Sequence, residues 1–186
     1  STEIYKGMDL LDNKLGGTAP LDVVINAPKN WITDIEEESF DDDFGFEDEE
    51  SINNGYWWNT ISLEKLEQIH DYLDSLPEIG KVLSVASGIK VATELKDGEP
   101  LSELDLALVK NMLPEEIKEN LLSSYISNDE NQVRISARVI ESAEGLNRNE
   151  LLDEISETLK TDYSLEEEQF RLTGLAVLYN NMLQSL

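Results

Sequence analysis

The sequence predicts an α+β fold built from two strand–helix–strand units. Between residues 20 and 86, a β-branched run precedes an amphipathic helix and a second apolar run, and the same order recurs between residues 132 and 173. Two βαβ units, 20–86 and 132–173, are the pattern of a split βαβ (ferredoxin-like) sandwich. Because 186 residues suit one domain, we expect a single domain over 1–186. An acidic loop at about 30–60 and a helical insertion at about 88–124 would interrupt it.

Apolar spacing, glycine and proline define the elements of the first unit. Residues 3–15 read as an amphipathic helix that Gly16-Gly17 ends, with apolar residues at helical spacing (Ile4, Met8, Leu11 and Leu15). The β-branched run at 20–26 predicts a strand. Ser62 is expected to cap the next helix, which Pro77 ends, and a second strand is expected over 79–86.

The second half begins with helical segments and continues as the second unit. The helical segments are expected at 88–95, 101–112 and 114–124, and a turn at 128–131. Residues 132–140 alternate apolar and polar side chains, which predicts a strand with one buried and one wet face. A helix over 147–161 and a strand over 169–173 complete the pattern.

The charge excludes several function classes. The chain has 14 Lys and Arg against 40 Asp and Glu, a net charge of −26. That balance argues against nucleic acid as a partner, because phosphate backbones need a basic surface, and it disfavours docking on anionic lipid headgroups. With no cysteine, disulfides, thiol nucleophiles and Cys-ligated metals are excluded.

Calcium is the one metal that the acidic segment invites. Eleven acidic residues and no basic one lie between Asp34 and Glu50, and carboxylates are suitable calcium ligands. The run from Asp41 to Asp43 starts no EF-hand, however, because glycine falls fifth and Ile52 occupies the twelfth position. We expect a solvated loop, and the sequence assigns no metal ligand and no cofactor.

No catalytic constellation emerges. His70 is the single histidine and lies at the edge of an apolar helical face, so we expect it to pack rather than to react. No nucleophile elbow and no phosphate-binding glycine loop accompany it. We therefore expect no catalytic residues and a protein that is not an enzyme.

The aromatic triplet Tyr56, Trp57 and Trp58 follows the acidic segment. Such rings could line a groove for an amphiphile, because they offer apolar faces with polar tips. They could equally anchor the end of the loop on the sheet. These three residues are the candidate substrate contacts.

The tail from Leu172 to Leu186 carries no charged residue. Fifteen residues are too few to span a bilayer. The tail is either a buried terminal helix or the first turns of a longer, membrane-spanning one. No signal peptide is visible, and the start at Ser1 suggests a processed chain or a fragment.

Four segments of the chain resemble parts of one family of transporters: Tyr5–Ile25, Leu76–Ser84, Asn111–Glu116 and Arg171–Leu186. The first resembles the stretch that follows the first transmembrane helix in exporters of the resistance-nodulation-division (RND) superfamily, in its MMPL-like, hopanoid-exporter-like branch. The last resembles the stretch that runs into the second transmembrane helix. The acidic insertion departs from this family's pattern.

The resemblance implies a porter-type domain at the extracytoplasmic (periplasmic or outer) face of the cytoplasmic membrane, part of an integral membrane protein. In the family, this domain contributes to the path by which lipids or other amphiphiles leave the membrane, and the proton gradient drives export. The implied partners are the membrane helices, the second porter loop and a lipid or amphiphile cargo. A homo-oligomer of the full-length protein stays open.

Two other functions remain as alternatives. One is a soluble acidic interaction module, or a calcium-responsive one, of α+β type, in which Asp41–Asp43 would bind the ion. The other is a hydrolase that depends on His70.

Overall fold

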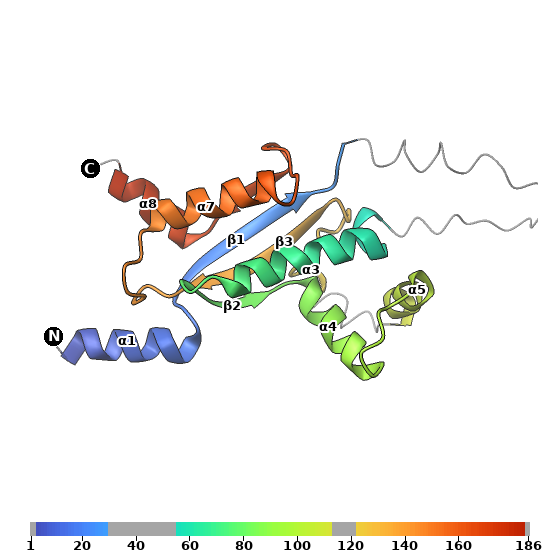
Figure 1. Ribbon diagram of the computed structural model, residues 1–186, viewed down its shortest axis with the longest axis horizontal. Coiled ribbons are helices and arrows are strands. Elements are labelled where there is room, and N and C mark those ends of the chain that lie inside the picture. The colour runs from blue at the N-terminus through green and yellow to red at the C-terminus, as the bar shows by residue number, and fades with distance from the viewer. Residues whose placement is uncertain (1–2, 30–54, 113–121, 185–186) are drawn as a thin grey trace, which may run out of the picture.

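The computed structural model describes residues 3–29, 55–112 and 122–184. Its helices are α1 (Glu3–Leu15), α3 (Thr60–Ser75), α4 (Val85–Leu95), α5 (Glu103–Met112), α7 (Arg148–Thr161) and α8 (Leu175–Gln184), with a short 3₁₀ turn, η1 (Tyr56–Trp58). Its strands are β1 (Ala19–Asn26), β2 (Ile79–Leu83), β3 (Gln132–Val139) and β4 (Phe170–Thr173). The α+β class predicted from the sequence is confirmed (Figure 1).

Among the described residues, the strands form one four-stranded antiparallel sheet in the order β2-β3-β1-β4. β3 lies between the two strands of the first unit, and β1 lies between the two strands of the second. The two strand–helix–strand units therefore interleave. β1 and β3 share the longest register, from Ala19 opposite Val139 to Asn26 opposite Gln132.

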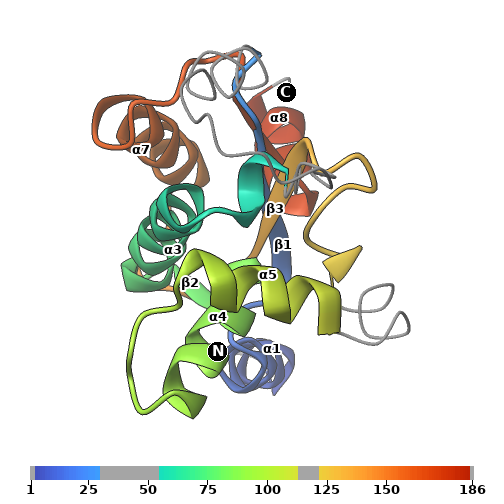
Figure 2. The same ribbon diagram turned by 90° about the vertical axis from the view of Figure 1, so that its right-hand side faces the viewer.

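The hydrophobic core lies between one face of the sheet and the helices α3 and α7. Alternate residues of β1 and β3 point into it, as the strict alternation of β3 predicts. The fully buried side chains include Leu21, Val23, Ile25, Leu66, Ile69, Leu73, Val133, Ile135, Ile155 and Leu159. Figure 2 shows α3 and α7 together on this side of the sheet.

Two boundaries differ from the sequence-based prediction. α3 begins at Thr60, because the Asn59 side chain, rather than Ser62, accepts from a backbone N–H of the first turn (2.8 Å, from Ser62 N). β2 ends at Leu83 rather than at residue 86. Ser84 instead caps α4, since its hydroxyl accepts from Ala86 N (3.1 Å) and its own N–H donates to Ser87 Oγ (3.2 Å).

Two predictions lie mostly outside the described residues. The acidic loop falls on residues 30–54, and most of the helix expected at 114–124 falls on 113–121. The helical character of the insertion between β2 and β3 is confirmed for α4 and α5.

The two terminal helices are attached to the sheet but expose apolar side chains. On these two helices, the large exposed apolar residues are Leu10, Leu11 and Leu15 of α1 and Leu175, Leu178, Tyr179, Met182 and Leu183 of α8, with exposed fractions between 43% and 63%; α4 and α5 expose others, among them Leu95 and Leu104. Ala176 and Asn180 are the buried positions of α8. Figure 1 shows both chain ends at the same end of the molecule's long axis. Across the described ranges, no helix has both the length and the apolar character needed to cross a bilayer.

Candidate functional site

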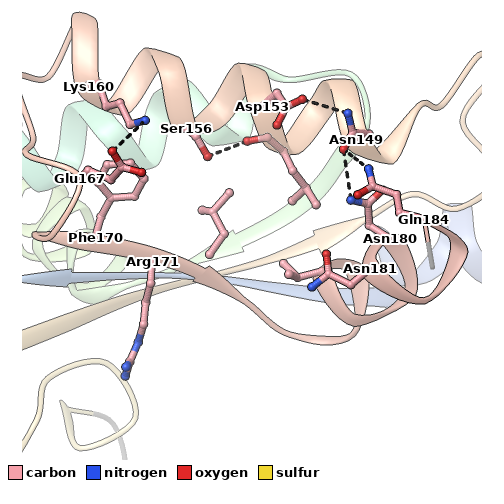
Figure 3. A pocket seen from close by; sticks show the side chains of 13 residues that line it. Asn149, Asp153, Ser156, Lys160, Glu167, Phe170, Arg171, Asn180, Asn181 and Gln184 are labelled. Atoms are coloured by element: carbon pink, nitrogen blue, oxygen red, sulfur yellow. Dashed lines mark hydrogen bonds and ion pairs between the residues drawn. The ribbon is translucent and has the colours of Figure 1, made fainter.

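A cavity of about 450 Å³ lies between α7, β4 and α8 (Figure 3). Small-molecule sites commonly have volumes of roughly 300–1,000 Å³, so this cavity has room for a small ligand or for one end of a longer one. It is the candidate site, because it adjoins the terminal helix α8, which exposes several large apolar side chains.

The cavity follows from two parallel stripes on α7. The apolar stripe contains Leu151, Leu152, Ile155 and Leu159, which are buried in the core. A polar stripe beside it contains Asn149, Asp153, Ser156 and Lys160, spaced four, three and four residues apart, so its members share one helical face. This polar stripe lines the cavity, with Asn149 beside α8 at one end and Lys160 beside Glu167 at the other (Figure 3).

β4 and α8 supply the remaining surfaces. Phe170 and Leu172 point to the helix-covered side of β4, and Phe170 is buried. Together with Leu152 and Val177 they give the cavity an apolar part. From α8, Asn180, Asn181 and Gln184 line it with side-chain amides. The site thus combines an apolar surface with a rim of side-chain amides and several charged groups.

Asn149 connects the two helices across the cavity (Figure 3). Its Oδ1 accepts from Asn180 Nδ2 (3.4 Å) and from Gln184 Nε2, and its Nδ2 donates to Asp153 Oδ2 (2.9 Å). Asn180 is itself buried, so its amide needs such a partner. These amide contacts add to the packing of α8 on β1, β4 and α7 and place its C-terminal half beside Asn149.

Charged residues line both ends of the site, with Lys160 and Glu167 at one end and Asp153, beside Asn149, at the other. Lys160 Nζ is 3.9 Å from Glu167 Oε2 and 3.6 Å from Glu157 Oε1. Ser156 Oγ donates to the carbonyl of Leu152 (2.8 Å). The arrangement suits binding of a molecule that has both an apolar and a polar part.

The structure places the predicted substrate contacts elsewhere. Tyr56 is half-buried, while Trp57 and Trp58 are buried beside α3 as part of the core. The Tyr56 and Trp57 rings meet edge to face at 4.9 Å, and Lys110 Nζ lies 5.5 Å from the centre of a Trp58 ring. Neither indole N–H has an acceptor among the described residues. The prediction that this triplet contacts substrate remains untested.

His70 packs against the start of α4, as expected for a structural histidine. It is buried, and its Nδ1 lies 2.9 Å from Ser84 Oγ, the atom that caps α4. Burial, with a smaller contribution from nearby Lys90, lowers the pKa of His70. Ser84 is also buried, so this Ser–His pair joins α3 to α4 rather than facing a substrate.

The calcium alternative rests on Asp41–Asp43, which lie outside the described residues. Within the described ranges, no group of three or more His, Asp or Glu side chains is placed to hold a metal ion.

Sequence reasoning did not find the α7–α8 cavity. The regular spacing of the polar stripe on α7 could have indicated a polar surface. The residues of α8 that contact the stripe are about thirty positions away, in the uncharged tail, so the sequence alone does not bring them together. Comparison with protein-family models, curated proteins and solved structures finds no match to this chain.

Proposed function

We propose that this chain is an extracytoplasmic domain of a proton-driven RND-type exporter of lipids or other amphiphiles, held between two membrane helices. Its role is to form part of the substrate path, not to catalyse a reaction. The family resemblance of residues 5–25 and 171–186 suggests the idea, and the two terminal helices supply the structural support.

The observation that carries the proposal is the pair of uncovered apolar faces on α1 and α8. Exposed apolar patches mark protein or membrane interaction sites, and α1 and α8 together expose eight large apolar side chains, each by 43% or more. Their chain ends also lie at the same end of the molecule (Figure 1). A domain whose two ends enter one bilayer needs both properties, because both ends must reach the same surface.

We also propose the finer fold assignment, a ferredoxin-like sandwich with a helical insertion. The strand order β2-β3-β1-β4, with two helices on one face, supports it. In this account the α7–α8 cavity belongs to the substrate path, since it lies directly beside the helix that leads toward the membrane.

The proposal is tested by the membrane topology of the full-length gene product. The chain has no cysteine, so one introduced thiol reports on this domain alone once any flanking cysteines have been replaced. Glu144→Cys lies on an exposed loop, and Ala137→Cys, in the core, is the matched control. A membrane-impermeant maleimide should label E144C in intact cells and leave A137C unlabelled. Labelling of E144C only after cell lysis would place the domain inside the cytoplasm and refute the proposal.

A further inference from the structure

Most of the arginines of this acidic chain lie on one face of the sheet. The chain contains four arginines, and Arg134, Arg138 and Arg171 occupy exposed positions of β3 and β4. These positions alternate with the core residues, so their side chains project from the face opposite α3 and α7. Figure 3 shows Arg171 pointing away from the cluster of side chains around Asn149.

The register brings Arg134 and Arg171 to the same point on this face. Both are paired with Val24 of β1, Arg134 from β3 and Arg171 from β4. Neighbouring strands lie about 4.8 Å apart, so the two backbones are separated by roughly twice that distance. Two long side chains that project from the same side of the sheet can reach one anion above Val24.

Residues 122–127 lie beside the two arginines and form one side of a cavity above Val24. Residues 122–127 fold against the start of β3, where Arg134 N donates to Tyr125 O (2.8 Å) and Ser127 N donates to Gln132 O (2.9 Å). The resulting cavity measures about 200 Å³ and is lined by both arginines, Val24, Gln132 and the serine-rich segment. This volume is below the usual range for drug-sized ligands and suits a small polar group.

The charged side chains that line this cavity are positive, whereas the net charge of the chain is negative. No Asp or Glu is among the described residues that line it, in a chain with 40 acids. Neither guanidinium forms an ion pair with a described carboxylate, whereas Arg148 is paired with Glu141. Asp22, on the same face of β1, is diagonal to both arginines in the register and makes no ion pair with either within the described part of the chain.

We propose that this cavity binds a phosphate group through Arg134 and Arg171. Guanidinium groups bind phosphate oxygens in bidentate pairs, and two of them can share one tetrahedral anion. The net charge of −26 repels anions in general, so binding has to come from this local pair. The inference is independent of the proposed export function, and the phosphate can be free or carried by a lipid headgroup.

Calorimetric titration of the chain at low ionic strength tests the proposal, with inorganic phosphate and with a short-chain phosphatidic acid below its micelle concentration. Arg134→Gln and Arg171→Gln should each raise the dissociation constant at least tenfold. Arg138→Gln, on the same face but outside the cavity lining, should change it less than twofold. Similar constants for both probes identify a free-phosphate site, and tenfold tighter binding of the lipid identifies a headgroup site; either supports the proposal.

Equal binding by the wild type and all three variants would overturn the proposal, as would the absence of binding by both probes. A peptide of residues 34–50 that bound with the same arginine dependence, while phosphate did not bind, would assign the face to an acidic polypeptide instead. Thermal unfolding midpoints within about 2 °C of the wild type would show that the variants remain folded.

Discussion

Asp12 ties α1 to the rest of the domain through three side-chain hydrogen bonds, and its removal should loosen that helix. Its side chain is almost fully buried, with 2% exposure. Oδ1 accepts from the Thr18 hydroxyl (2.7 Å), and Oδ2 accepts from the Ser142 backbone N–H (2.7 Å) and hydroxyl (2.8 Å). One carboxylate therefore ties α1 both to the start of β1 and to the loop that follows β3.

The expected cost of Asp12→Ala follows from these three bonds. Hydrogen bonds to a charged group contribute about 1.5–3 kcal/mol each, but bonds that share one carboxylate are not additive. We expect a loss of about 3 kcal/mol in the free energy of unfolding, or roughly 6–12 °C in Tm for a chain of this length. Asp12→Asn, which keeps one acceptor oxygen, should lose about half as much.

The pH dependence gives this prediction a second readout. Burial works to raise the pKa of Asp12, but the hydrogen bonds from Ser142 and Thr18 outweigh it and hold the pKa below its usual 3.8. The unfolded chain therefore takes up the proton first as pH falls, so the stabilisation is complete above about 3.8 and is lost below it. The difference between wild type and D12N should thus be the same at pH 7 and pH 5.

Urea unfolding followed by circular dichroism measures these differences, and amide hydrogen exchange shows whether α1 in particular loses protection. Glu3→Gln removes the same charge from the same helix, with no hydrogen bond at stake among the described residues, and should change stability by less than about 0.5 kcal/mol. If D12A matched the wild type in stability and in exchange at α1, the reasoning that this carboxylate anchors the helix would be wrong.

Three further predictions concern the packing and pH response of the domain. Gly80→Ala should lower the free energy of unfolding by about 2 kcal/mol in urea, because the added Cβ would lie 2.2 Å from Gly16 O. Gly88→Ala, in open space on α4, should raise the free energy of unfolding by about 0.5–1 kcal/mol. Equal effects of the two substitutions would contradict the close approach of Gly80 to Gly16. Asn59→Ala should cost about 1 kcal/mol through the lost cap of α3, and an unchanged unfolding midpoint would remove that assignment. Burial lowers the pKa of His70 below its usual 6.5, so the unfolded state binds the proton first and the free energy of unfolding should fall as pH drops from 6.5 toward 5. His70→Gln should reduce this pH dependence of stability. The same pH dependence in the variant would exclude His70 as its source.

The bounds of a helix or strand could be predicted from the sequence where one local signal was present, and the prediction was wrong where two local signals competed. β3 was predictable because its alternation admits no other period. The end of β2 was not, because Ser84 and the apolar residues after it suit a strand, whereas the hydrogen bonds of Ser84 to Ala86 and Ser87 begin a helix. At α3, Asn59 and Ser62 are both good capping residues, and only the fold shows which one caps.

The candidate site was less predictable than the fold, because its parts come from distant segments. Asn149 and Asn180 are 31 residues apart and meet only because β4 and α8 fold back along α7. The pairing of Arg134 and Arg171 across Val24 depends in the same way on strand order, which composition does not reveal. The triplet Tyr56, Trp57 and Trp58 was predicted to contact substrate because of its aromatic rings, yet Trp57 and Trp58 lie in the core.

If both terminal helices lead into one bilayer, the reading frame around this chain should show it. We expect an uncharged apolar stretch of about 20 residues directly after Leu186, the length of one membrane helix, and a second one shortly before Ser1. A frame that continues in polar sequence on both sides would contradict the proposed membrane anchoring and leave the exposed side chains of α1 and α8 to a protein partner.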